Sequence, residues 1–213
     1  MRLHELLEIV DKEDIFSTGY LLAGKTDPRE IQRQLSRWRK SGRIVQLRKG
    51  LYMLAPPFRK EAVHPFLIAN RLVKGSYVSL HSALWFHGMI PEAVQVTTSV
   101  TTLRPGFRDT PVGSFSFHKI KHALFHSYVR LEVAKDSWAF VATPEKALCD
   151  LVHLTPRGDS AEYLSELRLQ NLSKLDPSMF EKIARDFGKP RMMRALRGVI
   201  ALREAEKREF ATQ

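Results

Sequence analysis

The feature that most restricts the fold is the order of local patterns in the first 57 residues. Apolar residues at helical spacing predict a first helix over residues 2–10. Ser17 or Thr18 is the expected N-cap of a short second helix that ends near Gly24. Asp27 is the expected N-cap of a third helix. The chain is therefore expected to begin with three helices in succession.

The third helical pattern is followed by two short β-prone runs. Pro28 in its first turn and Gly42 after its end give this helix the usual asymmetry of helix termini. Residues 44–54 then contain two β-prone runs joined by the turn Arg48-Lys49-Gly50, which predicts a hairpin. Three helices and a hairpin, closed by Pro56-Pro57, follow the order of a winged helix-turn-helix. We therefore expect a DNA-binding domain of that class over residues 1–56.

The pattern changes after residue 60. Helical periodicity covers residues 64–73, 81–89 and 143–154. Strands are expected at residues 77–80, 93–100, 113–120, 127–133 and 137–143. The rest of the chain reads as helices over residues 160–169, 177–187 and 190–208. The sequence thus predicts the α+β fold class, with a mixed α/β domain over residues 61–213, a mostly antiparallel sheet and a helical C-terminal end over residues 155–213.

Basic charge is concentrated in the third helix and the turn that follows the next strand. The chain has a formal net charge of +11, and residues 25–60 contain eleven Lys or Arg against two Asp or Glu. A charge of this sign favours an anionic partner. A basic helix face is most often only solvated, but such faces normally interleave acids with the cations. Here no acid occurs between Glu30 and Glu61, which favours a nucleic-acid surface.

Angular positions separate the apolar and basic residues of the third helix. At 100° per residue, Ile31, Leu35 and Trp38 form one apolar stripe. The residues expected to read base edges in the major groove are Arg29, Gln32, Arg33 and Ser36. The residues expected to contact phosphates, from the helix, its end and the wing, are Arg37, Lys40, Arg43, Arg48 and Lys49.

The predicted partner of this surface is double-stranded promoter DNA. Binding by a dimer, or by a pair of protomers on an inverted repeat, would suit a helix-turn-helix protein. RNA is disfavoured because no stacking aromatic side chains are interleaved with the exposed cations.

Histidine spacing raises the question of a metal site. His118, His122 and His126 are four residues apart, as metal ligands on one helix face are. The alternation around His118 indicates a strand, however, so the three histidines are not expected to share a face. We therefore expect neither a metal site nor a cofactor.

Two further groups of residues resemble parts of catalytic sites. His81 beside Ser82, with Asp150, suggests a hydrolase triad, but the Gly-x-Ser-x-Gly turn is absent. Glu145, Lys146 and Asp150 suggest a nuclease, although Glu145 is explained equally by the first turn of a helix capped by Thr143. We therefore expect a protein that is not an enzyme.

The C-terminal helix contains a second arginine-rich pattern. Arg191, Arg194 and Arg197 recur at a spacing of three beside apolar residues. They form either a solvated edge or a partner surface, which would suit a DNA backbone and an acidic protein patch equally well.

Composition also restricts the location of the protein. The single cysteine, Cys149, excludes an internal disulfide. No apolar run approaches the ~20 residues of a membrane-spanning helix, and acids replace the apolar part of a signal peptide near the N-terminus. We therefore expect a soluble, cytoplasmic protein without membrane contact.

Four stretches in this order have a counterpart in a known family: "GRIVQLRKGLYML", "YVSLHSALWFHGMIPE", "FVATPEKALCDLVHL" and "YLSELRLQNL". They resemble the AbiEi-type antitoxins of type IV toxin–antitoxin systems over nearly the whole chain. The chain departs from the family pattern at Cys149, where an apolar residue is expected, and matches it loosely over residues 97–125.

The resemblance implies autorepression of the operon by the N-terminal domain and neutralisation of a cognate nucleotidyltransferase-like toxin by the C-terminal domain. For some relatives it also implies a role in phage defence. Two alternatives stay open: a solitary winged-helix transcription regulator whose second domain binds a ligand or dimerises, and a nuclease targeted to DNA.

Overall fold

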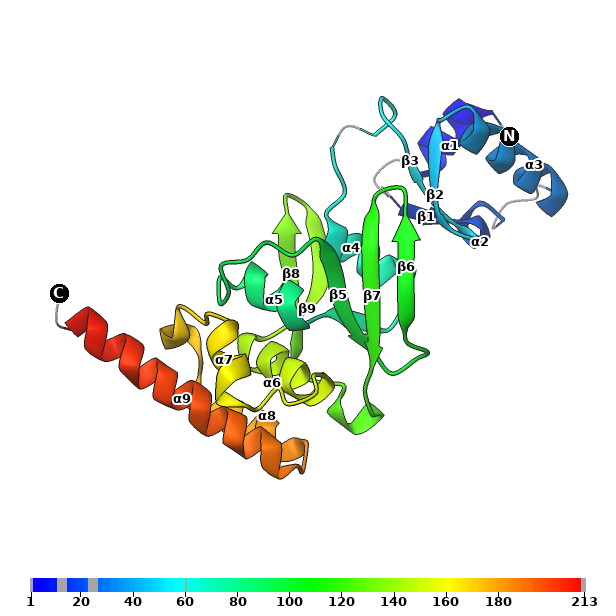
Figure 1. The fold of residues 1–213 in the computed structure, drawn as a ribbon. Helices are drawn as coiled ribbons and strands as arrows, with labels where there is room; N and C mark the ends of the chain where they lie inside the picture. Colours follow the sequence, from blue (N-terminus) through cyan, green and yellow to red (C-terminus); the bar gives the residue numbers. More distant parts are fainter. Residues whose placement is uncertain (1, 11–14, 23–26, 60, 212–213) are drawn as a thin grey trace.

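The computed structural model describes residues 2–10, 15–22, 27–59 and 61–211, with side chains described up to residue 208. The described residues form a mixed α+β structure, as predicted. Short helices and a hairpin lie at one end, a long C-terminal helix lies at the other, and a six-stranded sheet lies between them (Figure 1). Within these residues no helix is both long and apolar enough to span a membrane.

The N-terminal unit consists of the elements α1 to β3. Its elements are α1 (Leu3–Val10), β1 (Ile15–Ser17), α2 (Thr18–Leu21), α3 (Pro28–Lys40), β2 (Ile44–Arg48) and β3 (Leu51–Leu54). The three strands form an antiparallel sheet in the order β1-β3-β2. This is the expected winged helix-turn-helix with one additional strand. Strand β1 was not predicted because three residues are too few to show alternation.

Side chains define the ends of α2 and α3. Ser17 Oγ accepts a hydrogen bond from a first-turn backbone N–H of α2 (3.3 Å), and the Asp27 carboxylate does the same for α3 (2.9 Å). Gly42 follows α3 with φ +69°, a conformation that favours glycine. The predicted helix starts are confirmed, whereas Gly24, the predicted end of the second helix, lies outside the described residues.

The small sheet of the N-terminal unit is buried on both faces. One face packs against α1 to α3 through residues such as Phe16, Ile44 and Leu54. The other face, through Leu47 and Met53, belongs to the core of the remainder of the chain. Because the two parts share this core, the winged helix is held against its neighbour rather than tethered to it. The division at residues 56–61 stays a prediction.

The large sheet is mixed. Its order is β6 (Gly106–Thr110), β7 (Gly113–Lys119), β5 (Val96–Thr101), β4 (Ser76–Val78), β9 (Ser137–Ala142), β8 (Tyr128–Ala134). The pairs β6–β7, β4–β5 and β8–β9 are antiparallel, whereas β5–β7 and β4–β9 are parallel. Antiparallel pairs thus predominate. Strand β6 was not predicted, because "GFRDT" has no apolar alternation.

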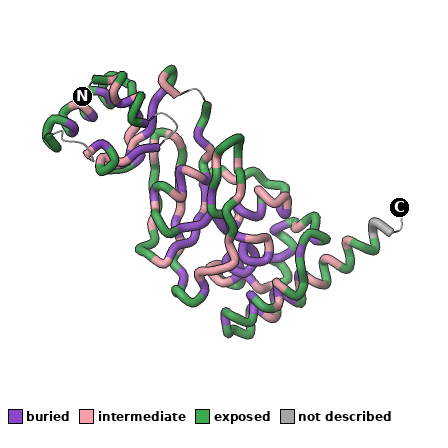
Figure 2. The backbone as a smooth tube through the Cα atoms, turned by 180° about the vertical axis from the view of Figure 1, so that it is seen from behind, coloured by how far each residue is buried: buried purple, intermediate pink, exposed green. Residues whose placement is uncertain are grey.

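The C-terminal unit consists of the elements α4 to α9 together with this sheet. Its helices are α4 (Pro65–Leu72), α5 (Leu80–Phe86), α6 (Pro144–Leu154), α7 (Ala161–Glu166), α8 (Pro177–Asp186) and α9 (Pro190–Ala211), with 3-10 turns at His122–Leu124 and Leu172–Lys174. Helix α9 passes close to α7, since a Cβ at Gly198 would lie 2.8 Å from Leu164 Cδ1. Beyond the buried Val199, α9 alternates between exposed and half-buried residues (Figure 2).

Candidate nucleic-acid interface

Helix α3 separates an apolar face from a polar face. Ile31, Leu35 and Trp38 are buried in the N-terminal core, with at most 2% of their surface exposed. All nine residues predicted to contact DNA are exposed: Arg29, Gln32, Arg33, Ser36, Arg37, Lys40, Arg43, Arg48 and Lys49. The predicted apolar stripe is therefore confirmed, and the predicted contact residues lie on the solvent side.

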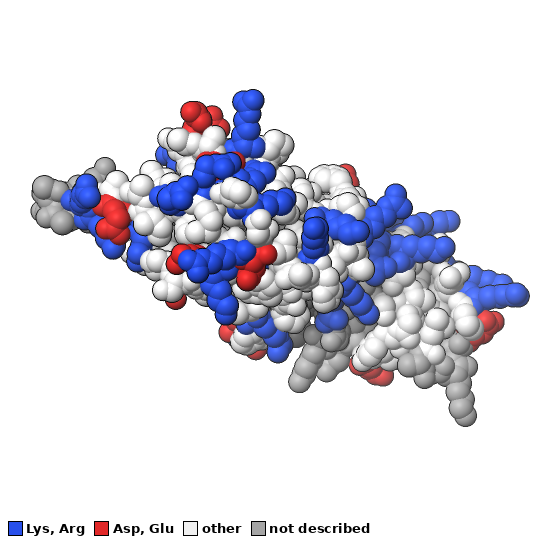
Figure 3. All heavy atoms as spheres, turned by 90° about the horizontal axis from the view of Figure 1, so that it is seen from below, with Lys and Arg blue, Asp and Glu red and all other residues white. Residues whose placement is uncertain are grey.

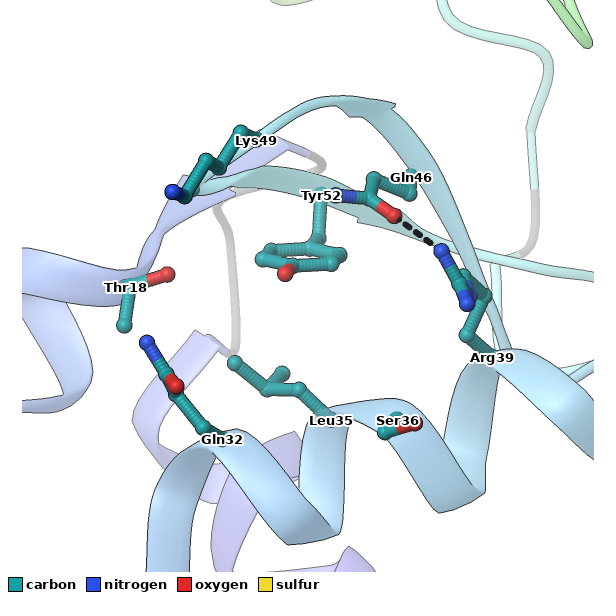
Figure 4. A pocket seen from close by; sticks show the side chains of 9 residues that line it. Thr18, Gln32, Leu35, Ser36, Arg39, Gln46, Lys49 and Tyr52 are labelled. Atoms are coloured by element: carbon teal, nitrogen blue, oxygen red, sulfur yellow. Dashed lines mark hydrogen bonds between the residues drawn. The ribbon is translucent and has the colours of Figure 1, made fainter. Parts of the chain in front are cut away.

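A concave pocket of about 380 Å³ lies between α3 and the hairpin β2–β3 (Figure 4). The helix contributes Gln32, Ser36 and Arg39, and the hairpin contributes Gln46 and Lys49. The remaining lining residues are Thr18, Leu35, Gly50 and Tyr52. The structure thus brings Gln32, Ser36 and Lys49 together around one hollow, in which hydrogen-bonding groups face solvent from both the helix and the wing.

Arg39 belongs to this surface but was not predicted to. Its Nη1 donates a hydrogen bond to Gln46 Oε1 at 2.6 Å, which joins the last turn of α3 to strand β2. At 100° per residue Arg39 lies about 80° from Ile31, at the edge of the apolar stripe. Arg39 is recognised as part of this surface only when the position of the wing beside the helix is known, and helical periodicity does not predict that position.

Besides Arg39, five exposed cations lie on α3 or just after its end. Among the described residues, no hydrogen bond or ion pair engages the side chains of Arg29, Arg33, Arg37, Lys40 and Arg43. Arginines and lysines that are not neutralised internally keep their full attraction for phosphates. Lysine and arginine also outnumber acids over the face of the molecule drawn in Figure 3. Among the described residues, the outer side of α3 therefore presents positive charge that no ion pair neutralises.

Arg48 is placed differently from the other predicted wing cation. Its Nε donates to the Leu72 carbonyl at the end of α4 (3.1 Å), and its Nη1 donates to the Lys49 carbonyl (3.2 Å). The Arg48 side chain therefore holds the wing against the C-terminal unit. Lys49 is the wing cation that lines the pocket beside α3.

The residues considered for a nuclease form a buried structural network. Lys146 Nζ lies 2.6 Å from Asp150 Oδ1, and both side chains are fully buried. Asp150 Oδ2 accepts hydrogen bonds from the Tyr77 and Ser79 hydroxyls, each at 2.8 Å. Burial, followed by the nearby Asp150 carboxylate, raises the pKa of Tyr77. A network without solvent access offers no route for a nucleic-acid substrate.

Glu145 is also engaged structurally. It is 3% exposed, and its Oε1 accepts a hydrogen bond from the Asp176 backbone N–H at 2.9 Å. Thr143 Oγ1 accepts from the Lys146 N–H (3.3 Å), as expected for the N-cap of α6. The Glu145 contact ties α6 to the start of α8.

Three of the four stretches that carry the family resemblance contact one another in the C-terminal unit. Tyr77 and Ser79 contact Asp150 from the β4–α5 segment. In the same unit, Asn171 Nδ2 donates to the Gly88 carbonyl (2.7 Å). The Gln170 N–H donates to the Met89 carbonyl (3.0 Å). These motifs therefore connect segments far apart in the sequence, which gives them a role in the fold.

The triad residues are not connected. Ser82 Oγ accepts from the Thr98 N–H at 2.8 Å and is committed to strand β5, whereas the hydrogen bonds of Asp150 go to other partners. His81 lies beside Ser82 in α5. Burial, then the proximity of His118, lowers the pKa of His81.

The three spaced histidines lie on different elements. His118 is in strand β7, His122 is in a 3-10 turn, and His126 follows that turn. Among the described residues no three His, Cys, Asp or Glu side chains are grouped closely enough to hold a metal ion.

Two of the three arginines predicted on α9 are paired within the molecule. Arg194 Nη2 lies 2.7 Å from Asp159 Oδ2, and Arg191 Nε lies 3.5 Å from Asp159 Oδ1. Arg191 Nη2 also donates to the Thr155 carbonyl at 2.6 Å. Arg197 is exposed. The arginine edge of α9 thus serves mainly to fasten this helix to the loop before α7.

No protein-family model matches the chain, and no curated protein matches it. Among solved structures, the crystal structure of the Rv2827c protein from Mycobacterium tuberculosis is similar, with a TM-score of 0.57. The similarity covers 93% of this chain and 76% of that chain, at 18% sequence identity. At this identity the likeness shows a common fold and gives no function.

Proposed function

We propose that the protein binds double-stranded promoter DNA through its winged helix-turn-helix and represses its own operon. The observation that carries this proposal is the outer face of α3. Its exposed cations have no acidic partner among the described residues, and it borders a pocket completed by the wing. A helix of this kind enters the major groove while cations around it contact the backbone.

The proposed roles follow from the positions of the side chains. Arg29, Gln32 and Arg33 lie on the first two turns of α3, whose N-terminal half approaches the base edges in this class of motif, and Ser36 follows one turn later on the same side. Arginine pairs with guanine, and glutamine pairs with adenine. Arg37, Lys40, Arg43 and Lys49 would contact phosphates. Arg48 would position the wing, since it is bonded to α4.

For the C-terminal unit we propose the antitoxin role that the family resemblance implies, without catalysis by this chain. The partner would be a cognate toxin of the nucleotidyltransferase type. The supporting observation is that three of the four resembling stretches contact one another in the C-terminal unit, through Asp150 and the Gly88–Asn171 contact. A solitary regulator that binds a ligand is the second candidate, because the unit contains a pocket lined by aromatic and basic residues.

The DNA-binding proposal is tested with the full-length protein and duplex DNA from upstream of its own gene. We expect Arg33→Ala to weaken binding to this DNA by about 1–3 kcal/mol and to affect random DNA little. An equal loss on both DNAs would move Arg33 to the phosphate contacts. No loss on either DNA would contradict the placement of α3 in the groove.

The antitoxin proposal is tested by co-expression with the neighbouring gene, with both genes under independent promoters. Full-length protein should restore growth, and so should Arg33→Ala, because repression no longer affects expression in this arrangement. Absence of rescue by both proteins would reject the antitoxin role and leave the DNA-binding proposal intact.

A further inference from the structure

A second concave pocket, of about 390 Å³, lies where the large sheet separates. Strands β4 and β9 are neighbours in the sheet order, yet they pair only at Val78 and Val141. On one side of this point the strands diverge. The end of α4 and the start of β4 form one wall, and residues of β8 and β9 form the other.

Asn70 holds this separation in place. Its Oδ1 accepts a hydrogen bond from the Phe140 backbone N–H at 2.6 Å, and its Nδ2 donates to the Ser76 carbonyl at 3.2 Å. Asn70 therefore bridges backbone groups of β9 and β4 that a continuous ladder would pair directly. The pocket is thus built into the fold before any ligand arrives.

Aromatic side chains form the strand wall of the pocket. Trp138 and Phe140 are 42% and 44% exposed, and as alternate residues of β9 they lie on the same face of the sheet. Phe140 meets Tyr128 edge to face at 5.9 Å. Tyr128 in turn stacks on buried Tyr77 at 4.6 Å and 12°. Because the Tyr77 hydroxyl is bonded to Asp150, this wall is fixed from behind by the buried network.

Cations complete the pocket. Arg71 and Lys74 line it from the end of α4 and the loop that follows, and Arg130 lines it from β8. The Arg130 guanidinium lies 4.9 Å from the centre of the Trp138 ring. None of the described residues that line the pocket is acidic. The pocket therefore suits an anion that also carries a flat aromatic group.

We propose that this pocket binds one nucleotide unit, with the base against Trp138 and Phe140 and the phosphate near Lys74 and Arg130. Base–aromatic stacking is a common and sequence-tolerant way to hold a base. A purely apolar ligand would leave the cations unused, and inorganic phosphate would leave the aromatic wall unused. The volume lies near the lower end of the range for small-molecule sites, which suits a mononucleotide.

The unit can come from a free nucleotide or from a single-stranded nucleic acid, and the experiment separates the two. Full-length protein is titrated calorimetrically with AMP, GMP, CMP and UMP, and with a short oligothymidylate. Adenosine and inorganic phosphate serve as partial ligands. At least one nucleotide or the oligonucleotide should bind with Kd below about 1 mM, and each partial ligand should bind about tenfold more weakly.

Lys74→Ala and Phe140→Ala should each weaken binding about tenfold. Matched controls are Lys119→Ala and Phe107→Ala, which remove an exposed lysine and an exposed aromatic outside the pocket lining. Phe140→Leu, which removes the aromatic ring but keeps a large apolar side chain, replaces Phe140→Ala if that variant does not fold.

Mononucleotide binding that the pocket variants weaken would identify a free nucleotide as the ligand. Oligonucleotide binding alone, weakened by the same variants, would identify a single strand. No binding of either probe would overturn the proposal, and so would binding that Lys74→Ala and the aromatic variants leave unchanged.

Discussion

Helices α3 and α9 both carry arginine along one edge, and the molecule uses them differently. On α3 the outer cations face solvent without partners among the described residues. On α9, Arg191 and Arg194 converge on Asp159, and Lys207 pairs with Glu204 (3.0 Å) further along the helix. The side-chain chemistry is the same, and the difference lies in the acids within reach.

The comparison shows which sequence property separates a basic helix with solvent-facing cations from one whose arginines are paired within the molecule. Arginine spacing alone does not, because Arg191, Arg194 and Arg197 are spaced as regularly as the cations of α3. A long stretch without acids around the helix, such as residues 31–60, is more informative. Charge that is neutralised within the protein releases no counterions from DNA.

The largest expected difference between α3 and α9 is in the loss of DNA affinity when three cations are removed from each helix. The triple variant Arg29→Ala, Arg33→Ala, Arg37→Ala should lose about 100-fold or more in affinity for duplex DNA, because each side chain contributes a base or phosphate contact. Alanine preserves the helix. Affinity is measured by fluorescence anisotropy at fixed salt.

The matched triple variant on α9 removes Arg191, Arg194 and Arg197. It should change DNA affinity by about twofold or less and should instead lower the melting temperature, since two ion pairs are lost. Equal losses of DNA affinity in the two triple variants would remove the distinction between the helices.

Lowering the pH should destabilise the C-terminal unit through His153 of α6. Burial, followed by the nearby charges of Lys189 and Arg191, lowers the pKa of His153 from 6.5 to about 4. Between these two pKa values His153 is protonated in the unfolded chain but neutral in the native state. Its contribution to the free energy of unfolding is therefore fully present above pH 6.5 and is lost as the pH decreases. The expected loss is about 1–2 kcal/mol, allowing for the partly exposed ring.

The measurement is urea unfolding of the wild type and of His153→Gln at neutral pH and near pH 4.5. The variant should lose less stability over this interval than the wild type. Identical losses would show that His153 does not carry the effect.

Breaking the α9 pairs from the acidic side should have a moderate effect. Asp159→Asn removes the partner of Arg194 and Arg191 and should lower the free energy of unfolding by about 1 kcal/mol. Glu181→Gln is the control, because it breaks an exposed pair with Arg185 that should contribute little. A loss from Glu181→Gln as large as that from Asp159→Asn would contradict the structural role of Asp159.

The smallest expected difference in DNA binding is between variants of the two adjacent wing cations. Lys49→Ala should weaken DNA binding about twofold to fivefold and reduce the salt dependence by about one unit of slope. Arg48→Ala should leave this slope unchanged and lower stability slightly, because Arg48 is bonded to the Leu72 carbonyl. Thermal unfolding and salt-dependent anisotropy distinguish these outcomes. An equal reduction of slope in both variants would place Arg48 on the DNA.

Much of the fold could be predicted from local patterns. The N-caps Ser17, Asp27 and Thr143 and the apolar stripe of α3 follow from short-range physics, so their elements were expected. Strands β1 and β6 were missed because their identity depends on pairing with β3 and β7 rather than on their own sequence.

The candidate site could be predicted only in part, because distant segments of the chain position some of its residues. The exposed side of α3 follows from helix periodicity, which is a local property. The contacts of Arg39 and Arg48 depend on the positions of the wing and of α4. These positions cannot be predicted from the sequence of α3 or of the turn alone. The burial of Lys146 and Asp150 likewise depends on Tyr77 and Ser79, about 70 residues earlier in the chain, so their network resembled a catalytic cluster in the sequence.

The most direct test of DNA binding through α3 is the salt dependence of the binding constant on duplex DNA. With about four to five phosphate contacts, log K of the wild type should fall with log salt at a slope near −4. In a second α3 variant, Arg37→Ala, Lys40→Ala, Arg43→Ala, the slope should fall in magnitude to about −1 to −2, since three of the proposed phosphate contacts are gone. A slope that is unchanged in that variant would contradict the account, because the DNA would then be held by another surface.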